Sequence, residues 1–292
     1  MSRGVSVLIV AHGGREVLAA TLRGLEAERD DLLEVIVADN GSPDDTVAMV
    51  QQDFSWIRVL ELGENLGFGA ANNRAAAIAR GDLLLLLNSD ARPHPGTIGQ
   101  LVSALRADAG AAVACPRLDY ADGSPQFHWA PTTSVVGEAL QLLRNRVEHL
   151  GWVHRPIGGR GWFTAACLMA RRAAFEQIEG FDEGFFLYFE DVDLCLRLRA
   201  AGWRLLDVPS ARAVHLKGGS QRPNGDGAPL SPAGELEYRR SQLRYYAVHR
   251  PRWEQRLLRW KLRRKFERVD DADRRRQLLA LLDARTPAGR RC

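Results

Sequence analysis

Two groups of polar side chains in this sequence have the types and spacing that chemistry needs. The first follows three apolar segments and consists of Asp39-Asn40, the amide-rich loop 65–73 and Asn88-Ser89-Asp90. If the apolar segments are parallel strands, these residues lie beyond their carboxyl ends, where open α/β sheets bind ligands. Aspartate is also favoured in loops that bind nothing, so simple loop capping by Asp39 and Asp90 is the alternative.

The second group is a cluster of acids within an aromatic segment. Glu190, Asp191 and Asp193 follow the aromatic run 181–189 and stand at the apparent start of a helix. Burial among aromatic rings raises the pKa of a carboxyl group, which suits a general base. The alternative is that these acids only complement the positive end of the helix dipole. Asp193 is expected to cap the helix.

Strands and helices alternate along the chain, which specifies a parallel α/β sheet with right-handed crossovers. We expect strands at residues 5–11, 33–40, 57–62, 82–87, 111–115 and 203–208, the last ending before Pro209. Expected helices are 15–27, 45–53, an alanine-rich helix ending near 79, 93–107, 193–201 and 234–284. Residues 116–128 are rich in turn formers, and 132–156 predict a loop or a mobile helix.

Composition places the chain among ordinary globular proteins. It has 292 residues, 46% hydrophobic and 26% charged, which excludes fibrous and disordered classes. Four scattered cysteines indicate neither a zinc site nor a disulfide framework, and favour a reducing compartment. The longest apolar run, 83–87, is far shorter than the roughly 18 residues of a membrane span. No dinucleotide or P-loop fingerprint follows the strands.

Charge divides the chain into an acidic body and a basic tail. Residues 239–292 carry 18 Lys and Arg against 6 Asp and Glu, which leaves 22 against 30 in residues 1–238. The acidic body argues against a nucleic-acid partner. The tail mixes its basic residues with Trp, Tyr, Phe and Leu, which suits peripheral contact with an anionic membrane. Packing of the same apolar stripe on the catalytic domain or on a second subunit is the alternative.

Several motifs, taken in order, resemble the family-2 glycosyltransferases and their rhamnosyltransferase-like branch. They are VSVLIVAH, VADNGSPD, NLGFGAANN, LLLNSDA and GFDEGFFLYFEDVDLCLRL, and the resemblance that they carry covers roughly residues 5–220. The resemblance implies an α/β protein of the glycosyltransferase A type, with a mostly parallel central sheet flanked by helices and a C-terminal helical extension. It divides the chain into a catalytic domain 1–220 (nucleotide-sugar half 1–115, acceptor half 116–220), a flexible loop 221–233 and a basic helical extension 234–292.

The resemblance also assigns roles to individual residues. Asp39 matches the position that hydrogen-bonds the nucleobase, and the loop after the first strand lies against the nucleoside. Trp162 lies in a segment that lines the sugar pocket, where it would stack on a sugar face, although a buried tryptophan is the ordinary alternative. The expected nucleotide-sugar ligands are Ala11, His12, Asp39, Asn40, Asn65, Gly67, Asn72, Asn88, Ser89, Asp90 and Trp162.

The family's acidic metal motif is reduced here to Asn88-Ser89-Asp90, which leaves one carboxylate. The resemblance makes Asp90 the main ligand of Mg²⁺ or Mn²⁺ and His215 a further one, with a structural histidine as the alternative. Lys217 and Arg222 are candidates for contact with the leaving diphosphate, or are solvated loop charges. The family's catalytic base maps onto Glu190-Asp191, with Asp191 as the base and Glu190 as its nearest rival.

These residues predict an inverting, metal-dependent glycosyltransferase in cell-surface polysaccharide synthesis. It would move a sugar such as rhamnose from a dTDP- or UDP-linked donor to a glycan or lipid-linked acceptor, in the cytoplasm or peripherally at the inner face of the cell membrane. A non-catalytic nucleotide-sugar or glycan-binding protein on the same fold is the first alternative, suggested by the reduced metal motif. A nucleotidyltransferase is the second, disfavoured because the glycine-rich basic loop of pyrophosphorylases is missing after the first strand.

Overall fold

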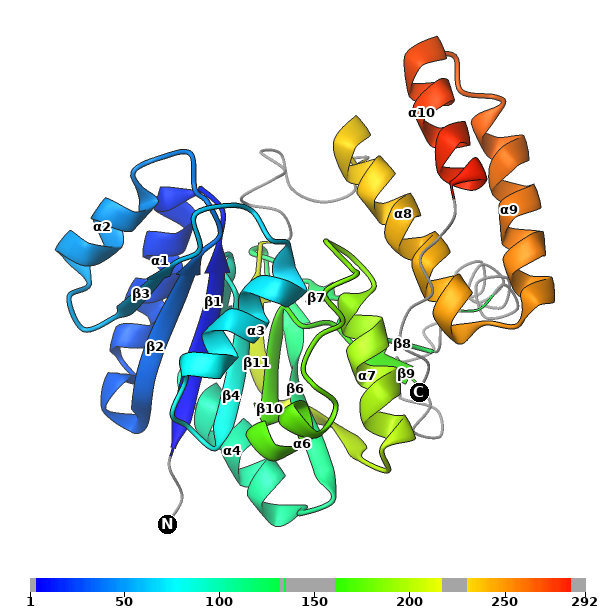
Figure 1. Cartoon of the computed structure of the whole chain (residues 1–292). Helices are drawn as coiled ribbons and strands as arrows, with labels where there is room; N and C mark the ends of the chain where they lie inside the picture. Colours follow the sequence, from blue (N-terminus) through cyan, green and yellow to red (C-terminus); the bar gives the residue numbers. More distant parts are fainter. Residues whose placement is uncertain (1–3, 132–133, 135–160, 217–229, 285–292) are drawn as a thin grey trace.

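A computed structural model describes residues 4–131, 134, 161–216 and 230–284 (Figure 1). One mixed sheet forms its centre, with the strand order β3-β2-β1-β4-β10-β6-β11-β5 and β7 paired with β6. The strands on the left of Figure 1, β1 (Val5–Ala11), β2 (Leu32–Asp39), β3 (Arg58–Glu61) and β4 (Leu83–Asn88), are parallel. Their carboxyl ends therefore share one edge of the sheet.

The other half of the sheet is mixed. β10 (Cys167–Arg171) is antiparallel to both β4 and β6 (Ala111–Asp119), whereas β6 and β11 (Arg204–His215) are parallel. The edge strands β5 (Ala91–Pro93) and β7 (Pro125–Gln126) pair antiparallel with β11 and β6. β8 (Trp129–Pro131) and β9 (Gly161–Phe163) form a separate ribbon. The sheet is thus mostly parallel, with β10 reversed in its middle.

Alternate residues of each strand face two hydrophobic layers. On one side, Val7, Val35 and Leu85 pack with α1 (Arg15–Glu26), α2 (Thr46–Asp53) and α4 (Thr97–Ala107). On the other, Leu8 and Leu86 pack with α3 (Phe68–Ile78), α6 (Arg172–Gln177) and α7 (Glu190–Ala200). The nearly continuous apolar strands of the sequence are explained by this burial on both faces.

Several expected elements differ from the structure. The strand expected at 111–115 continues to Asp119, the helix expected at 193–201 begins at Glu190, and the expected helix 234–284 is divided into three helices. The helix expected from residue 93 begins at Thr97, because residues 91–93 pair with β11 as an edge strand. The strand expected to end before Pro209 continues to His215. Its pairing with β6 shifts register between Val208 and Arg212, and this irregularity accommodates a proline that has no N–H to donate.

The C-terminal helices α8 (Pro232–His249), α9 (Arg252–Phe266) and α10 (Ala272–Asp283) form a third layer, drawn from yellow to red in Figure 1. Their core, which includes Tyr245, Leu262 and Leu278, also takes in Phe185 and Phe189 from the turn before α7. The C-terminal helices therefore pack on the α/β part of the chain through the turn before α7. Within the described residues, no helix is both long and apolar enough to cross a membrane.

The boundaries at 220 and 233 stay predictions, since the expected flexible loop falls largely on residues outside the described ranges. The same holds for most of segment 132–156.

Cys115, Cys167 and Cys195 are buried free thiols.

Candidate active site

Polar residues after β1, β2 and β3 form a connected network at the carboxyl edge of the sheet. The Asn40 amide donates to Asn65 Oδ1 at 2.9 Å, and Asn40 Oδ1 accepts from Leu66 N at 2.8 Å. The carbonyl of Ala11 accepts from Asn40 N, and His12 Nδ1 lies 2.9 Å from Asn40 O. Asn40 thus joins three of the expected nucleotide-binding segments into one surface.

Asp39 lies at the same edge and is 6% exposed. Its carboxylate oxygens are 3.3 and 3.4 Å from Ser42 N, so it also makes the loop contact that the capping alternative describes. Its backbone carbonyl accepts from Leu62 N at 2.9 Å. Hydrogen bonding of Asp39 to the nucleobase remains a prediction. The position of Asp39 at the end of β2 is compatible with that role.

Gly67 connects this edge to the aromatic segment. Its φ is +86°, and a Cβ atom here would lie 2.3 Å from the carbonyl oxygen of Phe186. Phe68 N donates to that same carbonyl at 2.9 Å. The backbone contact therefore requires glycine at position 67, whether or not a nucleotide binds there.

Two other expected ligands hold buried polar atoms without a partner among the described residues. Asn72 donates to Phe68 O at 3.0 Å, but its Oδ1 is buried and unpartnered. The Trp162 indole N–H is likewise buried and unpartnered, and the ring makes an edge contact with Phe127 at 5.5 Å. Such orphaned groups are rare in folded proteins and are satisfied when a ligand supplies the missing partner.

The reduced metal motif lies at the end of β4, beside the end of β11. His215 Nε2 is 3.3 Å from Asp90 Oδ1 and 3.2 Å from Asn88 Nδ2. The Ser89 carbonyl accepts a hydrogen bond from the Thr21 hydroxyl. Asp90 is 4% exposed. The strand that continues past Pro209 brings His215 to this position, so the expected pair of Asp90 and His215 is adjacent in space.

Gln126 of β7 fixes how His215 faces Asp90. The Gln126 amide donates to His215 O at 2.9 Å, so its other end, Oε1, is the acceptor 2.6 Å from His215 Nδ1. In a neutral His215 the proton therefore sits on Nδ1, and Nε2 is an acceptor that faces the Asn88 amide and lies beside the Asp90 carboxylate. Two acceptors in this position attract a cation, and a glutamine that sets the tautomer is typical support for a metal-binding histidine.

These residues fit a hard divalent ion that is completed by a substrate. Among the described residues, no cluster of three or more His, Cys, Asp and Glu side chains is suited to hold a metal. Asp90 and His215 would supply the protein ligands, and diphosphate oxygens and water the rest, as is usual for Mg²⁺.

The two acids of the expected base motif begin α7 in different environments. Glu190 is 7% exposed, and burial together with the neighbouring Asp191 charge raises the pKa of its carboxyl well above the usual range. Its Oε2 has no partner among the described residues, as suits a protonated group. Burial also raises the pKa of Asp191, but only to about 6, because hydrogen bonds from Val192, Ala165 and Thr164 stabilise its charge. At neutral pH, Asp191 is the ionised member of the pair.

The turn between β9 and β10 links the metal motif to this acid. Asn88 N donates to Ala166 O at 2.9 Å, while Ala165 and Thr164 of the same turn lie close enough to the Asp191 carboxyl to lower its pKa. The end of β4 and the start of α7 are therefore joined through three consecutive residues. This turn therefore lies between Asn88 of the reduced metal motif and Asp191 of the expected base motif.

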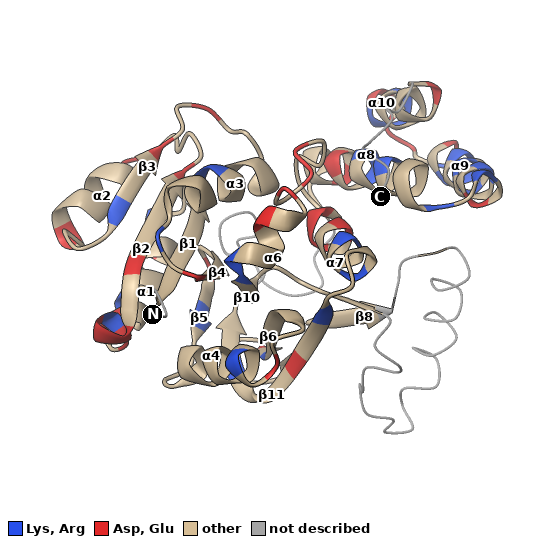
Figure 2. Ribbon diagram, turned by 60° about the horizontal axis from the view of Figure 1, so that its bottom comes forward, with Lys and Arg blue, Asp and Glu red and all other residues tan. Residues whose placement is uncertain are grey.

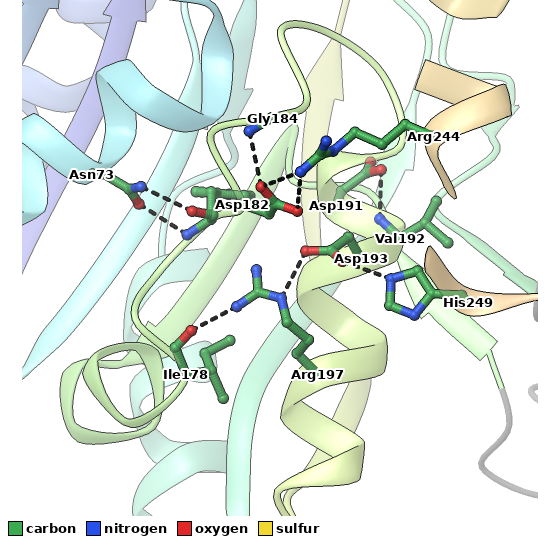
Figure 3. Close-up of polar contacts among 11 residues, drawn as sticks. Asn73, Ile178, Asp182, Gly184, Asp191, Val192, Asp193, Arg197, Arg244 and His249 are labelled. Atoms are coloured by element: carbon green, nitrogen blue, oxygen red, sulfur yellow. Dashed lines mark hydrogen bonds and ion pairs between the residues drawn. The ribbon is translucent and has the colours of Figure 1, made fainter. Parts of the chain in front are cut away.

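Asp193 has a different place from the one expected. The residue preceding α7 is Phe189, and no side chain caps the helix, so the cap expected at Asp193 is wrong. Asp193 is 1% exposed and instead binds Arg197 Nε and His249 Nε2, each at 2.7 Å (Figure 3). A buried carboxylate needs such partners, and these occupy one oxygen each.

Helix α8 holds the segment that leads into α7. Arg244 donates to both carboxylate oxygens of Asp182 at 2.9 Å (Figure 3). Ser241 donates to Leu187 O at 2.7 Å. From the opposite side, Asn73 exchanges hydrogen bonds with the Phe181 backbone. Between these supports, Tyr188 and Phe189 adopt the left-handed backbone with φ of +69° and +65°. Bulky residues hold this conformation only where their surroundings impose it.

Sequence reasoning missed the residues that support the site, notably Gln126, Thr164, Ser241, Arg244 and His249. The sequence shows them as polar residues of strands, turns and a long helix, without indicating the partners that they meet. Asn73 was expected beside the other amides, but it binds the 181–183 segment instead. Lys217 and Arg222 lie outside the described residues.

Comparison with known proteins gives the same family. The model of the glycosyl transferase family 2 matches residues 6–179. An N-acetylglucosaminyl-diphospho-decaprenol L-rhamnosyltransferase of Mycobacterium tuberculosis is 31% identical, over 90% of each chain. The rhamnosyltransferase WbbL of Escherichia coli K12 is 28% identical, over 72% of this chain and 83% of its own. This chain belongs to glycosyltransferase family 2, and these relatives are rhamnosyltransferases.

Solved structures show the same fold. GalNAc-T7 with UDP, GalNAc and Mn²⁺ superposes with a TM-score of 0.62 at 16% identity, covering 96% of this chain and 54% of that chain. Glucosyl-3-phosphoglycerate synthase of Mycobacterium tuberculosis with Mn²⁺, UDP and phosphoglyceric acid gives 0.55 at 21% identity, covering 82% and 78%. The expected glycosyltransferase A-type fold is confirmed.

Proposed function

We propose that the protein transfers a sugar such as L-rhamnose, with inversion, from a nucleoside diphosphate donor to a lipid-linked acceptor glycan. The single observation that carries the proposal is the turn 164–166, which accepts from Asn88 N at the end of the metal motif and, through Thr164 and Ala165, lowers the pKa of the nearby Asp191 carboxyl. The M. tuberculosis relative supports the acceptor class, because its name states a diphospho-decaprenol acceptor and L-rhamnose.

In this mechanism Asp191 accepts the proton of the acceptor hydroxyl. The hydroxyl oxygen forms a bond to the anomeric carbon, the bond from that carbon to the donor phosphate oxygen breaks, and the nucleoside diphosphate leaves with the electron pair. Burial and the Asp191 charge raise the pKa of Glu190 well above its usual range, which favours its neutral form beside the charged Asp191. Attack on the face opposite the leaving group inverts the anomeric centre, and one carboxylate suffices because no covalent enzyme intermediate forms.

Donor binding falls to the residues that follow the carboxyl ends of β1 to β4. Asp39, Asn40 and the loop at His12 would hold a dTDP or UDP nucleoside, and Asn72 and Trp162 would satisfy their orphaned atoms on the sugar or the acceptor. Asp90 and His215 would hold Mg²⁺ or Mn²⁺ against the diphosphate. The bound ion would stabilise the charge that develops on the leaving diphosphate.

Nucleotide release tests the proposal. The purified protein is incubated with dTDP-, UDP- and GDP-sugars, with and without Mn²⁺ or Mg²⁺, and with a polyprenyl diphosphate-linked N-acetylglucosamine acceptor. We expect acceptor- and metal-dependent release from dTDP-rhamnose. Saturable nucleotide binding without release from any donor, acceptor present, would instead support the non-catalytic binding protein that the reduced metal motif suggested.

A further inference from the structure

Helix α9 presents an exposed apolar face in addition to its buried one. Leu258, Leu262 and Phe266 are 1%, 4% and 0% exposed and pack in the core of the C-terminal helices. Trp253, Leu257 and Trp260 are 55%, 38% and 54% exposed. Their spacing of four and three residues puts them on one side of the helix. We call these three residues the tryptophan face.

The tryptophan face does nothing for the packing of α9, since the opposite side of the helix already supplies its core contacts. Two tryptophan rings exposed to water forgo the free energy that burial of their large apolar area would provide. Contiguous exposed apolar side chains of this size mark an interaction surface. The described residues hold other exposed large hydrophobic side chains, but Leu33, Phe127 and Phe186 lie on different elements.

Basic residues border the tryptophan face. Arg256, Lys261 and Arg264 are all exposed and adjoin it by helical position, and the Arg264 guanidinium lies 4.2 Å from the centre of the Trp260 ring. Seven of the fifteen residues of α9 are Lys or Arg. The one acid, Glu254, is 2% exposed and is bound by Arg250. Figure 2 shows the blue of Lys and Arg along this helix. The surface offered to a partner is therefore apolar at its centre and positive at its rim.

We propose that the tryptophan face docks the protein on an anionic phospholipid bilayer, with α9 lying in the plane of the interface. Indole rings prefer the headgroup level, where their apolar body is buried and their N–H stays in water. Arginine and lysine beside them reach the lipid phosphates. A two-fold contact with a second copy of the chain fits less well, because it would bring the same positive rim of both copies together.

The proposal is independent of the transfer reaction and is tested without donor or acceptor. Sedimentation of the full chain is measured with vesicles of phosphatidylcholine alone and with vesicles that also contain phosphatidylglycerol. We expect binding only to the anionic vesicles, a blue shift of tryptophan emission, and release by high salt, because exposed charges are screened.

Variants assign the binding to α9. The double variant Trp253→Gln, Trp260→Gln is expected to lose at least about tenfold in vesicle affinity and the blue shift with it. The double variant Arg256→Gln, Arg264→Gln is expected to lose the preference for anionic lipid. Leu33→Gln is the matched apolar control, since Leu33 is 40% exposed on β2 at the far end of the sheet. Arg23→Gln, Arg58→Gln is the charge control, because both arginines are exposed there too.

Several results would overturn the proposal. Failure of the wild-type chain to bind anionic vesicles excludes it directly. Equal loss in the Leu33 or the Arg23 and Arg58 control would mean that binding is not a property of α9. A concentration-dependent dimer that the double tryptophan variant abolishes, without vesicle binding, would assign the face to a second copy instead. Melting curves check that each variant is folded, and all substituted side chains are exposed.

Discussion

The donor edge is the set of loops that follow the carboxyl ends of β1 to β4, and the proposed catalytic pair is Glu190 and Asp191. The contacts that hold these two regions join residues at very different separations along the sequence. At the donor edge, Asn40 bonds the neighbouring loops at His12 and Asn65, which lie 28 and 25 residues away. The segment that leads to Glu190 and Asp191 is held by Asn73, 108 residues before Phe181, and by Arg244, 62 residues after Asp182. One region is assembled by consecutive strand–helix units, and the other by elements from both ends of the chain.

If Glu190 and Asp191 act as proposed, this difference makes the C-terminal helices part of the catalytic architecture, because α8 holds the segment that leads to them. The carboxyl ends of parallel strands meet at one edge whatever else the chain does, so the donor edge needs only the sheet. The catalytic pair follows two residues in a left-handed conformation, which survives only where its surroundings impose it. Helix α8 supplies three of those surrounding contacts, through Ser241, Arg244 and His249.

The largest expected effect is the loss of transfer activity when the proposed base Asp191 is replaced. Asp191→Asn removes the proton acceptor but keeps the size of the side chain, so we expect transfer to fall by about 10²–10⁴-fold. Nucleotide binding should stay within a few-fold, because the donor edge is untouched. Turnover and calorimetry of the same preparation measure both. Glu190→Gln is the matched control: Glu190 is held neutral, so the variant should retain far more activity than Asp191→Asn. The reverse ranking would make Glu190 the base.

The second prediction concerns the proposed metal ligand Asp90, whose loss should weaken donor binding at the donor edge. Losing an outer partner of a metal ligand costs about 10–100-fold in metal affinity, and losing the ligand itself costs more. We therefore expect Asp90→Asn to weaken Mn²⁺-dependent donor binding by at least about 100-fold and Gln126→Ala by less. Binding of the nucleoside monophosphate without metal is the control and should not change. Metal-independent donor binding in the wild type would contradict the assignment.

The two regions also predict different responses to pH. Since the pKa of Asp191 is raised to about 6, the carboxylate is lost as pH falls through this value. We expect kcat/KM to be about one tenth of its plateau at pH 5, to reach about half of it near pH 6, and to level off about one pH unit higher. In Asp39→Asn, at the donor edge, KM should rise while the shape of this profile stays the same. A limb near the ordinary carboxyl pKa would show that Asp191 is not the group that titrates.

The same contrast explains which parts of the fold and of the candidate site could be predicted from the sequence. Asp39, Asn40 and Asn65 follow apolar runs that only buried parallel strands explain, so their convergence could be predicted. The bulge at Pro209 could not, since proline alone argues for the end of a strand, and the continuation to His215 depends on pairing with β6. The role of His249 was equally hidden. Asp193 in the first turn of a helix resembles a capping acid, until a helix 56 residues away supplies its partner.

The smallest expected effect tests whether α8 positions the catalytic pair or only stabilises the fold. His249→Phe keeps an aromatic ring next to Tyr245 but removes the hydrogen bond to Asp193 Oδ1. An unsatisfied buried acceptor costs about 1–3 kcal/mol of unfolding free energy, which chemical denaturation measures. If α8 positions the pair, kcat also falls several-fold, while the donor KM does not change. His94→Phe, at an exposed histidine outside α8, is the matched control. A loss of stability with unchanged kcat would make the contact structural only, and the two regions would then be catalytically independent.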